Sequence, residues 1–96
     1  MQDEEIRRRL RAMPKAEVHV HLEGATDAET VWKMAARNGV SLPAATLDGW
    51  RDFYRFRDFD HFLSVYTAAC STMRTPQDFS LMAEAFLANQ ARQNVR

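Results

Sequence analysis

The sequence predicts an α/β fold in which one short strand is followed by several helices, and three observations carry this prediction. Apolar and polar side chains alternate over residues 16–22, which is the period of a strand with two different faces. Apolar residues recur at helical spacing on both sides of that segment. Thr, Asp, Pro and Gly stand where these helices would begin and end. The 96 residues have room for one small domain.

The composition is that of an ordinary globular protein, with 46% hydrophobic and 27% charged residues. Thirteen basic residues balance thirteen acidic ones, so no net charge attracts nucleic acid or an anionic membrane. No apolar run approaches the ~20 residues that span a bilayer, and no signal-peptide pattern opens the chain. The single cysteine, Cys70, indicates a reducing compartment. We therefore expect a cytoplasmic protein without a nucleic-acid or membrane partner.

The first element expected is an amphipathic helix over residues 4–13, where Ile6, Leu10 and Met13 share one face and Pro14 stops the helix. The strand over 16–22 follows. Its apolar face carries Val18, Val20 and Leu22, and its other face carries Glu17, His19 and His21. An apolar face suits a strand that helices cover in a parallel sheet.

A lone strand cannot satisfy its own backbone hydrogen bonds. Residues 94–96 are therefore expected to lead into a second strand, and the chain to be the opening part of a longer protein.

Four more helices are expected after the strand. The first has a capping-box pattern over 26–29 and ends at Gly39, with Val31, Met34, Ala35 and Asn38 on one face. Residues 47–56 are rich in aromatic side chains and suit a short helix or a packed loop. A helix over 59–73 would place one stripe on Phe59, Phe62, Leu63, Tyr66, Cys70 and Met73. Thr75 and Pro76 would begin the last helix, which would run to about Gln93 with a stripe of Phe79, Met82, Ala83, Phe86, Leu87 and Gln90.

His19 and His21 form a His-x-His pair, which on a strand puts two imidazoles on one face, about 7 Å apart at ~3.3 Å per residue. Imidazole nitrogen is a good ligand for zinc and similar divalent metals. A catalytic site keeps one metal position open for a water, and the ion lowers the pKa of that water toward neutrality. Such a pair alone is more often solvated or hydrogen-bonded than metal-bound.

The surroundings of the pair favour the metal site. The apolar opposite face, Gly24 at the strand end and a capped helix directly after form the layout of the first unit of a (β/α)₈ barrel. Glu23 is placed to accept hydrogen bonds from a sugar hydroxyl or water, and Gly24 allows close backbone approach to a ligand. We expect Glu17 to be a structural charge, and His61 to be solvated or beside a lid rather than a ligand.

The segment from Pro14 to Gly24 resembles the first-strand signature of the adenosine deaminase family, within the wider amidohydrolase superfamily. The resemblance continues along nearly the whole chain, through Glu29-Thr30, Arg37-Asn38-Gly39-Val40, Leu42-Pro43 and Phe59-Asp60-His61-Phe62-Leu63. It implies a (β/α)₈ TIM barrel. Residues 1–96 would be the N-terminal, mostly helical portion of this single metal-dependent hydrolase domain.

The resemblance also implies roles for individual residues. His19 and His21 match two ligands of a metal, Zn²⁺ or another divalent ion, and Gly24 matches a glycine whose backbone lies against the purine. Glu23 stands where adenosine enzymes often have an aspartate that contacts the ribose, which leaves the substrate open. A gate helix over the pocket is matched by Phe62, Leu63 and Tyr66.

The activity implied is hydrolytic loss of ammonia from C6 of a purine nucleoside, by a metal-activated water. The remaining ligands and the proton-donating glutamate belong to later strands, so no catalytic residue is expected in these 96 residues and the chain alone should be inactive. An adenosine-like nucleoside is the main substrate expected. Adenine and aminodeoxyfutalosine are the alternatives, and the oligomeric state is left open.

Two other classes compete with a purine deaminase. A phosphoesterase of the histidinol phosphatase type also opens with His-x-His, but it tends to continue with Thr or Ser rather than Leu22-Glu23-Gly24. A His-Ala-Gly-Glu segment further along would favour deamination. The third hypothesis is a non-catalytic metal-binding fragment, in which the histidines remain without an enzymatic role.

Overall fold

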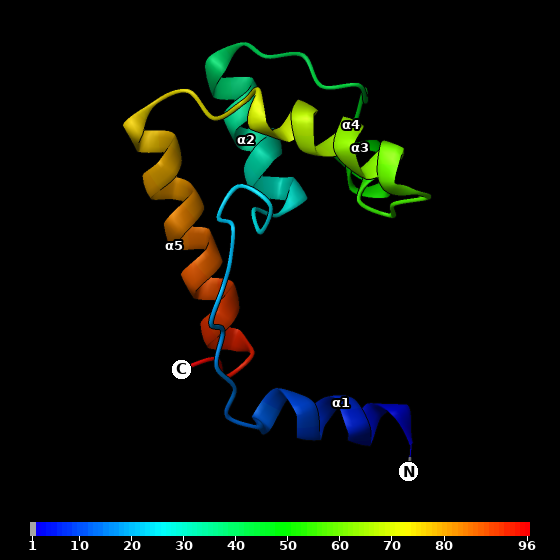
Figure 1. The fold of residues 1–96 in the computed structure, drawn as a ribbon, viewed down its shortest axis with the longest axis vertical. Coiled ribbons are helices and arrows are strands. Elements are labelled where there is room, and N and C mark those ends of the chain that lie inside the picture. Colours follow the sequence, from blue (N-terminus) through cyan, green and yellow to red (C-terminus); the bar gives the residue numbers. More distant parts are fainter. Residues whose placement is uncertain (1) are drawn as a thin grey trace.

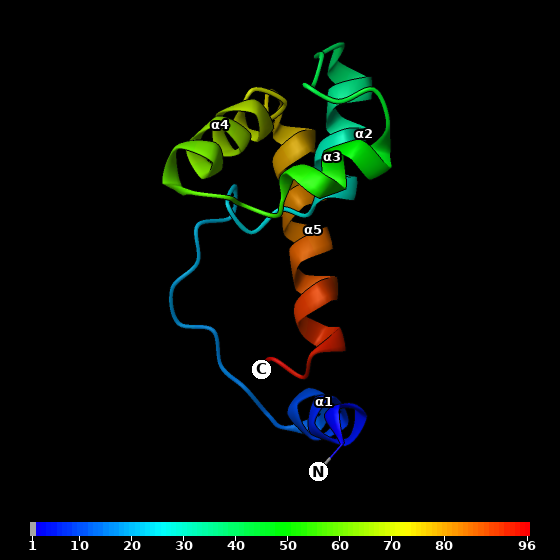
Figure 2. The ribbon, with the colours of Figure 1, turned by 90° about the vertical axis from the view of Figure 1, so that its right-hand side faces the viewer.

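Residues 2–96 are described by a computed structural model, in which the chain forms five helices (Figure 1). They are α1 (Asp3–Ala12), α2 (Ala28–Asn38), α3 (Leu47–Phe53), α4 (Phe59–Cys70) and α5 (Pro76–Arg92). Helices α2, α3 and α4 gather around one end of α5, and α1 lies across the other end (Figures 1 and 2). The radius of gyration is 15.1 Å, larger than the roughly 13 Å of a compact domain of about 100 residues. The described residues are therefore an open arrangement of helices.

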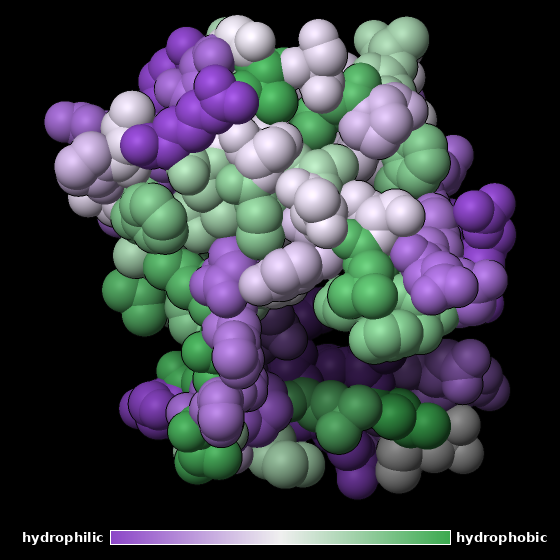
Figure 3. Space-filling view, turned by 45° about the horizontal axis from the view of Figure 1, so that its top comes forward, coloured by the Kyte–Doolittle hydropathy of each residue, from purple (hydrophilic) through white to green (hydrophobic). Residues whose placement is uncertain are grey.

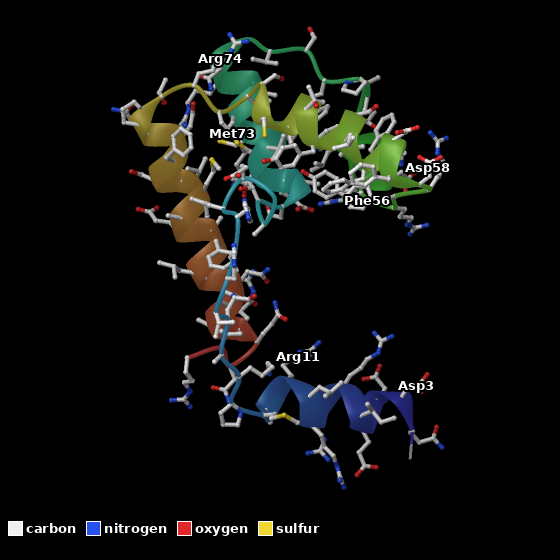
Figure 4. The ribbon with its side chains drawn as sticks, viewed as in Figure 1. Asp3, Arg11, Phe56, Asp58, Met73 and Arg74 are labelled. Carbon is white, nitrogen blue, oxygen red and sulfur yellow. The ribbon has the colours of Figure 1, made fainter. Side chains whose placement is uncertain are left out.

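Helix α1 is stabilised by charges at its ends. Acidic residues occupy its first turn and basic ones its last, which complements the helix dipole; Asp3 and Arg11 mark the two ends in Figure 4. The Lys15 ammonium donates to the carbonyls of Leu10 and, at 2.8 Å, of Met13. The expected helix is confirmed, but its apolar face is uncovered, and a hydrophobic band follows the lower part of the molecule, where α1 lies (Figure 3).

Helix α2 begins and ends at local signals in the sequence. The Asp27 side chain accepts a hydrogen bond from the backbone N–H of Thr30 at 2.8 Å, and Gly39 ends the helix with a φ of 65°. The expectation that Thr26 caps the helix is wrong. Its hydroxyl donates to the carbonyl of Leu22 at 2.8 Å, which leaves the cap to the following residue.

The remaining helix starts agree with the prediction. Residues 47–53 form the short helix α3, whose cap Thr46 accepts from the backbone of Gly49 at 3.1 Å. At α5, Thr75 and Asp78 form a reciprocal capping box, with Pro76 at the first helical position.

The core lies where α2 meets α3, α4 and α5. The expected inner face of α2 is confirmed, since Val31 and Met34 are fully buried and Ala35 nearly so. The core cluster comprises Ala28, Val31, Met34, Trp50, Val65, Ala69 and Met82.

The stripes expected on α4 and α5 are wrong in part. On α4 the buried residues are Val65 and Ala69, whereas Phe59 is 69% exposed. The aromatic rings on this side pack on each other: Phe56 and Phe62 meet edge to face at 5.0 Å, and the Phe56 side chain lies against this group in Figure 4. On α5, Met82 is buried as expected, but Phe79 and Leu87 are exposed.

A buried carboxylate joins α2 to α5. Asp78 is fully buried and accepts hydrogen bonds from the side chains of Arg37 and Asn38 and from the backbone N–H groups of Arg74 and Thr75. Burial alone would raise the pKa of this carboxyl, but these donors, led by Arg37, hold it far below its usual range. Asp78 is therefore charged at neutral pH and anchors both helices.

The strand expected over 16–22 does not form. Within residues 2–96 the only sheet pairing is one parallel bridge between Lys15 and Val95, and the segment after Lys15 bows away from α5 (Figure 2). A strand needs neighbours along its length, and the described chain offers it a partner only at 94–96. The bridge lies one residue before the expected strand, with Lys15 N donating to Asn94 O at 3.0 Å and Arg96 N to Lys15 O at 2.8 Å, and it involves the residues that were expected to lead into a second strand.

No helix in the part of the chain that the structure describes has the length and apolar character to cross a membrane.

Candidate metal and substrate site

The two histidines of the motif lie side by side. Their ring centroids are 5.3 Å apart and their planes differ by 15°, with both side chains exposed. The backbone from 16 to 21 is extended without being paired, and side chains two residues apart share one side of an extended chain. His19 and His21 therefore have the common orientation predicted, although the strand itself is missing.

A tight turn follows His21 and fixes the end of the motif. The backbone N–H groups of Gly24 and Ala25 both donate to the carbonyl of His21 at 3.0 Å. Leu22 packs against the hydrophobic core, and Thr26, just after the turn, is buried. The motif is thus attached to the beginning of α2 at this end.

Glu23 leaves the turn toward α4. Its Oε1 accepts a hydrogen bond from the Tyr66 hydroxyl at 3.0 Å and lies 3.7 Å from Nδ1 of His21. Its own backbone N–H, and then the Tyr66 hydroxyl, hold the pKa of the Glu23 carboxyl below its usual range. The same hydrogen bond raises the pKa of Tyr66 to about 12, so the tyrosine is a neutral donor to an ionised carboxylate.

Gly24 is not required by the backbone or by its neighbours. Its φ is not in the left-handed region, and a Cβ there would meet His21 O at 3.6 Å and Tyr66 Cε2 at 3.8 Å, which are ordinary contacts. A methyl group would therefore fit at this position in the described chain.

The three α4 residues expected to cover a pocket differ in position. Tyr66 reaches the motif directly, and the Phe62 ring packs against Tyr66 with centroids 5.9 Å apart. Leu63 is 42% exposed. Tyr66 thus faces the motif from α4, and Phe62 lies next to it on the same side of the helix.

His61 lies apart from the motif. It lines a hollow of about 440 Å³ between α3 and α4, which contains none of the residues predicted to bind metal or substrate. Its Nδ1 accepts from the backbone N–H of Arg57 at 3.2 Å, and its ring is half-buried. His61 is held as part of the α3–α4 connection rather than fully solvated.

The residues present fit a metal as part of a ligand set. Two neighbouring imidazoles on one side of the chain are donors of the type that suits zinc or a similar ion. No group of three or more His, Cys, Asp or Glu side chains that could hold an ion occurs within residues 2–96. The described chain therefore offers two ligands, and a closed site needs others.

The pairing of Tyr66 with Glu23 is the feature of the site that the sequence did not predict. The two residues are 43 positions apart, and neither strand nor helix periodicity relates them. Only their separate matches to the family motif pointed to both.

Comparisons with known proteins agree with the motif. The family model for adenosine deaminase matches residues 14–96. The chain is 47% identical over 87 residues to an adenine deaminase of Streptomyces coelicolor, which covers 91% of the chain and 26% of that protein. It is 43% identical over 88 residues to an adenine deaminase of Ralstonia nicotianae, covering 92% of the chain and 26% of the relative.

A solved structure is also similar. The crystal structure of adenine deaminase from Arthrobacter aurescens matches with a TM-score of 0.79 and 39% identity, over 88% of this chain and 26% of that one. The chain thus spans about a quarter of the length of the relatives it matches. Because the family model covers most of the 96 residues, the chain belongs to the adenosine deaminase family.

Proposed function

We propose that the protein carrying this chain removes ammonia from adenine by hydrolysis, with a metal held in part by His19 and His21. The observation that carries the proposal is the pair of parallel imidazoles beside the Glu23–Gly24 turn, in a chain whose relatives are named adenine deaminases. We place residues 1–96 in the first part of one (β/α)₈ barrel domain. The start of parallel pairing between Lys15 and Val95 supports this placement.

His19 and His21 would bind the ion through neutral ring nitrogens, and ligands from outside residues 2–96 would complete the set. Zn²⁺ suits this donor type, as do other divalent metals. When bound, the ion supplies a water of lowered pKa as the nucleophile and polarises the site.

Gly24 would face the purine. The described chain has room for a methyl group at this position, so packing within the described chain does not require a glycine there. Close approach of a flat ring to the backbone is a common reason for glycine at such a position.

Glu23 and Tyr66 favour adenine over an adenosine-like nucleoside, which the sequence left as the main reading. One carboxylate oxygen of Glu23 already accepts the Tyr66 hydroxyl, so this side chain is not free to receive a ribose hydroxyl with both oxygens. Adenine has no sugar and does not need that contact. Phe62 and Leu63, on the same helix, would add apolar surface beside the purine. The partner is thus a small-molecule purine, and the cytoplasm is the location we propose.

The experiment is steady-state ammonia release by the full-length protein, supplied with zinc, on adenine, adenosine and aminodeoxyfutalosine. We expect the highest kcat/KM on adenine. A higher value on either nucleoside would contradict the substrate, and inactivity on all three would contradict the deaminase. Metal analysis of the purified protein identifies the ion independently.

A further inference from the structure

Tyr66 contacts the motif at two points. Its hydroxyl donates to Oε1 of Glu23 at 3.0 Å, and its ring lies against Gly24, where a Cβ would come within 3.8 Å of Cε2. The two ends of this contact come from α4 and from the turn after the histidines, 43 residues apart. Tyr66 is thus the side chain that joins α4 to the motif.

The same carboxylate oxygen faces His21. Nδ1 of His21 lies 3.7 Å from Oε1 of Glu23, about 0.5 Å beyond the hydrogen-bond range. The Nδ1 edge of the ring therefore faces the carboxylate, which leaves Nε2 available as a ligand. Metal-bound histidines commonly donate their second ring N–H to a carboxylate, and this contact fixes the tautomer and orientation of the ring.

The thiol of Cys70, one turn further along α4, also lies near the Tyr66 hydroxyl. Burial raises the pKa of that thiol and keeps it neutral. A neutral thiol is a weak acceptor, whereas a carboxylate is a strong one. The hydroxyl is therefore directed to Glu23.

We propose that Tyr66 is a positioning residue of the metal site, whose hydroxyl holds the Glu23 carboxylate beside His21 and so orients the His21 ring for the ion. This inference rests on the proposed function, since it requires that His21 binds a metal. It gives Glu23 a role toward the metal ligand rather than toward a sugar. It also gives the hydroxyl of Tyr66 a role that the neighbouring ring of Phe62 could not fill.

The test measures Zn²⁺ affinity of the full-length protein by competition with a chromophoric chelator, which needs no turnover. Tyr66→Phe removes only the hydroxyl, and Glu23→Ala removes the carboxylate. We expect both to weaken zinc binding by about ten- to a hundredfold. Glu23→Gln keeps an acceptor oxygen and should fall between Glu23→Ala and the parent protein.

Matched controls exist for both residues. Tyr54→Phe removes the hydroxyl of a half-buried tyrosine that donates to the backbone carbonyl of Thr26 at 3.4 Å rather than to Glu23. Glu17→Ala removes a carboxylate of the same segment that faces Gln90 at 3.5 Å. Both controls should keep zinc affinity within twofold of the parent protein.

The double variant Tyr66→Phe/Glu23→Ala separates positioning from independent effects. If Tyr66 acts through Glu23, the double variant binds zinc as weakly as Glu23→Ala alone. Additive losses, or unchanged affinity in Tyr66→Phe, overturn the inference while the deaminase proposal stands. An unchanged affinity with a raised KM for adenine overturns it in favour of direct substrate contact.

Should Tyr66→Phe fail to fold, the Glu23 variants decide the outcome, because Glu23→Ala with parent-like zinc affinity overturns the inference by itself. A parent protein that neither binds zinc nor releases ammonia refutes the proposed function, and the inference with it.

Discussion

Two regions of this chain are held in opposite ways. In the cluster of α2–α5, Val31, Met34, Trp50 and Met82 are fully buried. In the segment 15–25, the His21 side chain is 73% exposed, and the segment is attached mainly at the Lys15 bridge and at the turn after His21. The residues of the candidate metal site therefore lie in an exposed segment that the described chain holds by few contacts. Substitutions in the two regions should therefore separate function from stability.

The largest effect is expected in the exposed region. His19→Ala or His21→Ala removes one of the two ligands and should lower kcat/KM for adenine by about a thousandfold or more, with loss of bound metal. The free energy of unfolding of the metal-free protein should change little, because both rings are exposed. Metal analysis checks the loss of bound metal, and urea unfolding of the metal-free protein checks its stability. A variant that keeps full metal content and activity would contradict the assignment of that histidine as a metal ligand.

The buried region should respond in the opposite sense. Met34→Ala leaves a cavity beside Val31 and Trp50 and should cost about 2–5 kcal/mol in free energy of unfolding. Lys33→Ala, at an exposed position of the same helix, is the control and should cost less than about 0.5 kcal/mol. Folded Met34→Ala protein should retain kcat/KM within a few fold. Equal costs for the two variants would contradict the assigned core.

Asp78 adds a pH dependence to the buried region. Asp78→Asn removes the charge that Arg37 and the capping N–H groups need, and should cost roughly 2–3 kcal/mol at pH 7. Because the folded pKa is lowered, the contribution of the carboxylate is complete above the unfolded pKa of about 4 and is lost as pH falls below it. Between pH 4 and pH 2 the parent protein should therefore lose more stability than Asp78→Asn. Parallel curves over that range would show that Asp78 is not the group responsible.

The smallest effect is expected at Gly24, in the turn after the histidines. Gly24→Ala should leave the melting temperature unchanged, since the added methyl group makes only ordinary contacts, and should raise KM for adenine by about tenfold. Gly39→Ala is the contrasting variant, because its φ of 65° disfavours a side chain. It should destabilise the protein and leave KM unchanged. An unaltered KM in Gly24→Ala would remove this residue from the substrate site.

The sequence predicted the features that depend on neighbours along the chain. The N-cap of α2 was predicted one residue too early, at Thr26 instead of Asp27. Gly39 at the end of α2 and the Thr75 cap of α5 are where they were expected, because a cap is formed by residues within about four positions of each other. The strand over 16–22 could not be decided locally, since a strand exists only through pairing with distant segments. The predicted buried stripe of α4 was wrong for a related reason. The aromatic rings of this region pack against each other near the surface, and Val65 and Ala69 are the α4 residues buried in the core.

The site follows the same division. The common side of His19 and His21 comes from their spacing alone and was predicted. The hydrogen bond from Tyr66 to Glu23 depends on how α4 packs on the turn, which no local pattern encodes.

The bridge at Lys15 has a consequence for how the chain tolerates change in length. Next to it, the side chain of Asn94 donates to the carbonyl of Ala12 at 2.7 Å across 82 positions, so the bridge closes a loop that contains four helices. The entropy of closing such a loop rises only with the logarithm of its length, and doubling it costs about 0.6 kcal/mol. Extra residues in the exposed connection around Ser41 and Ala45 should therefore be accepted at almost no cost. The contacts of His19 and His21 described above are with each other, with Glu23 and with the turn that follows them, so an insertion in that connection should leave the pair unchanged.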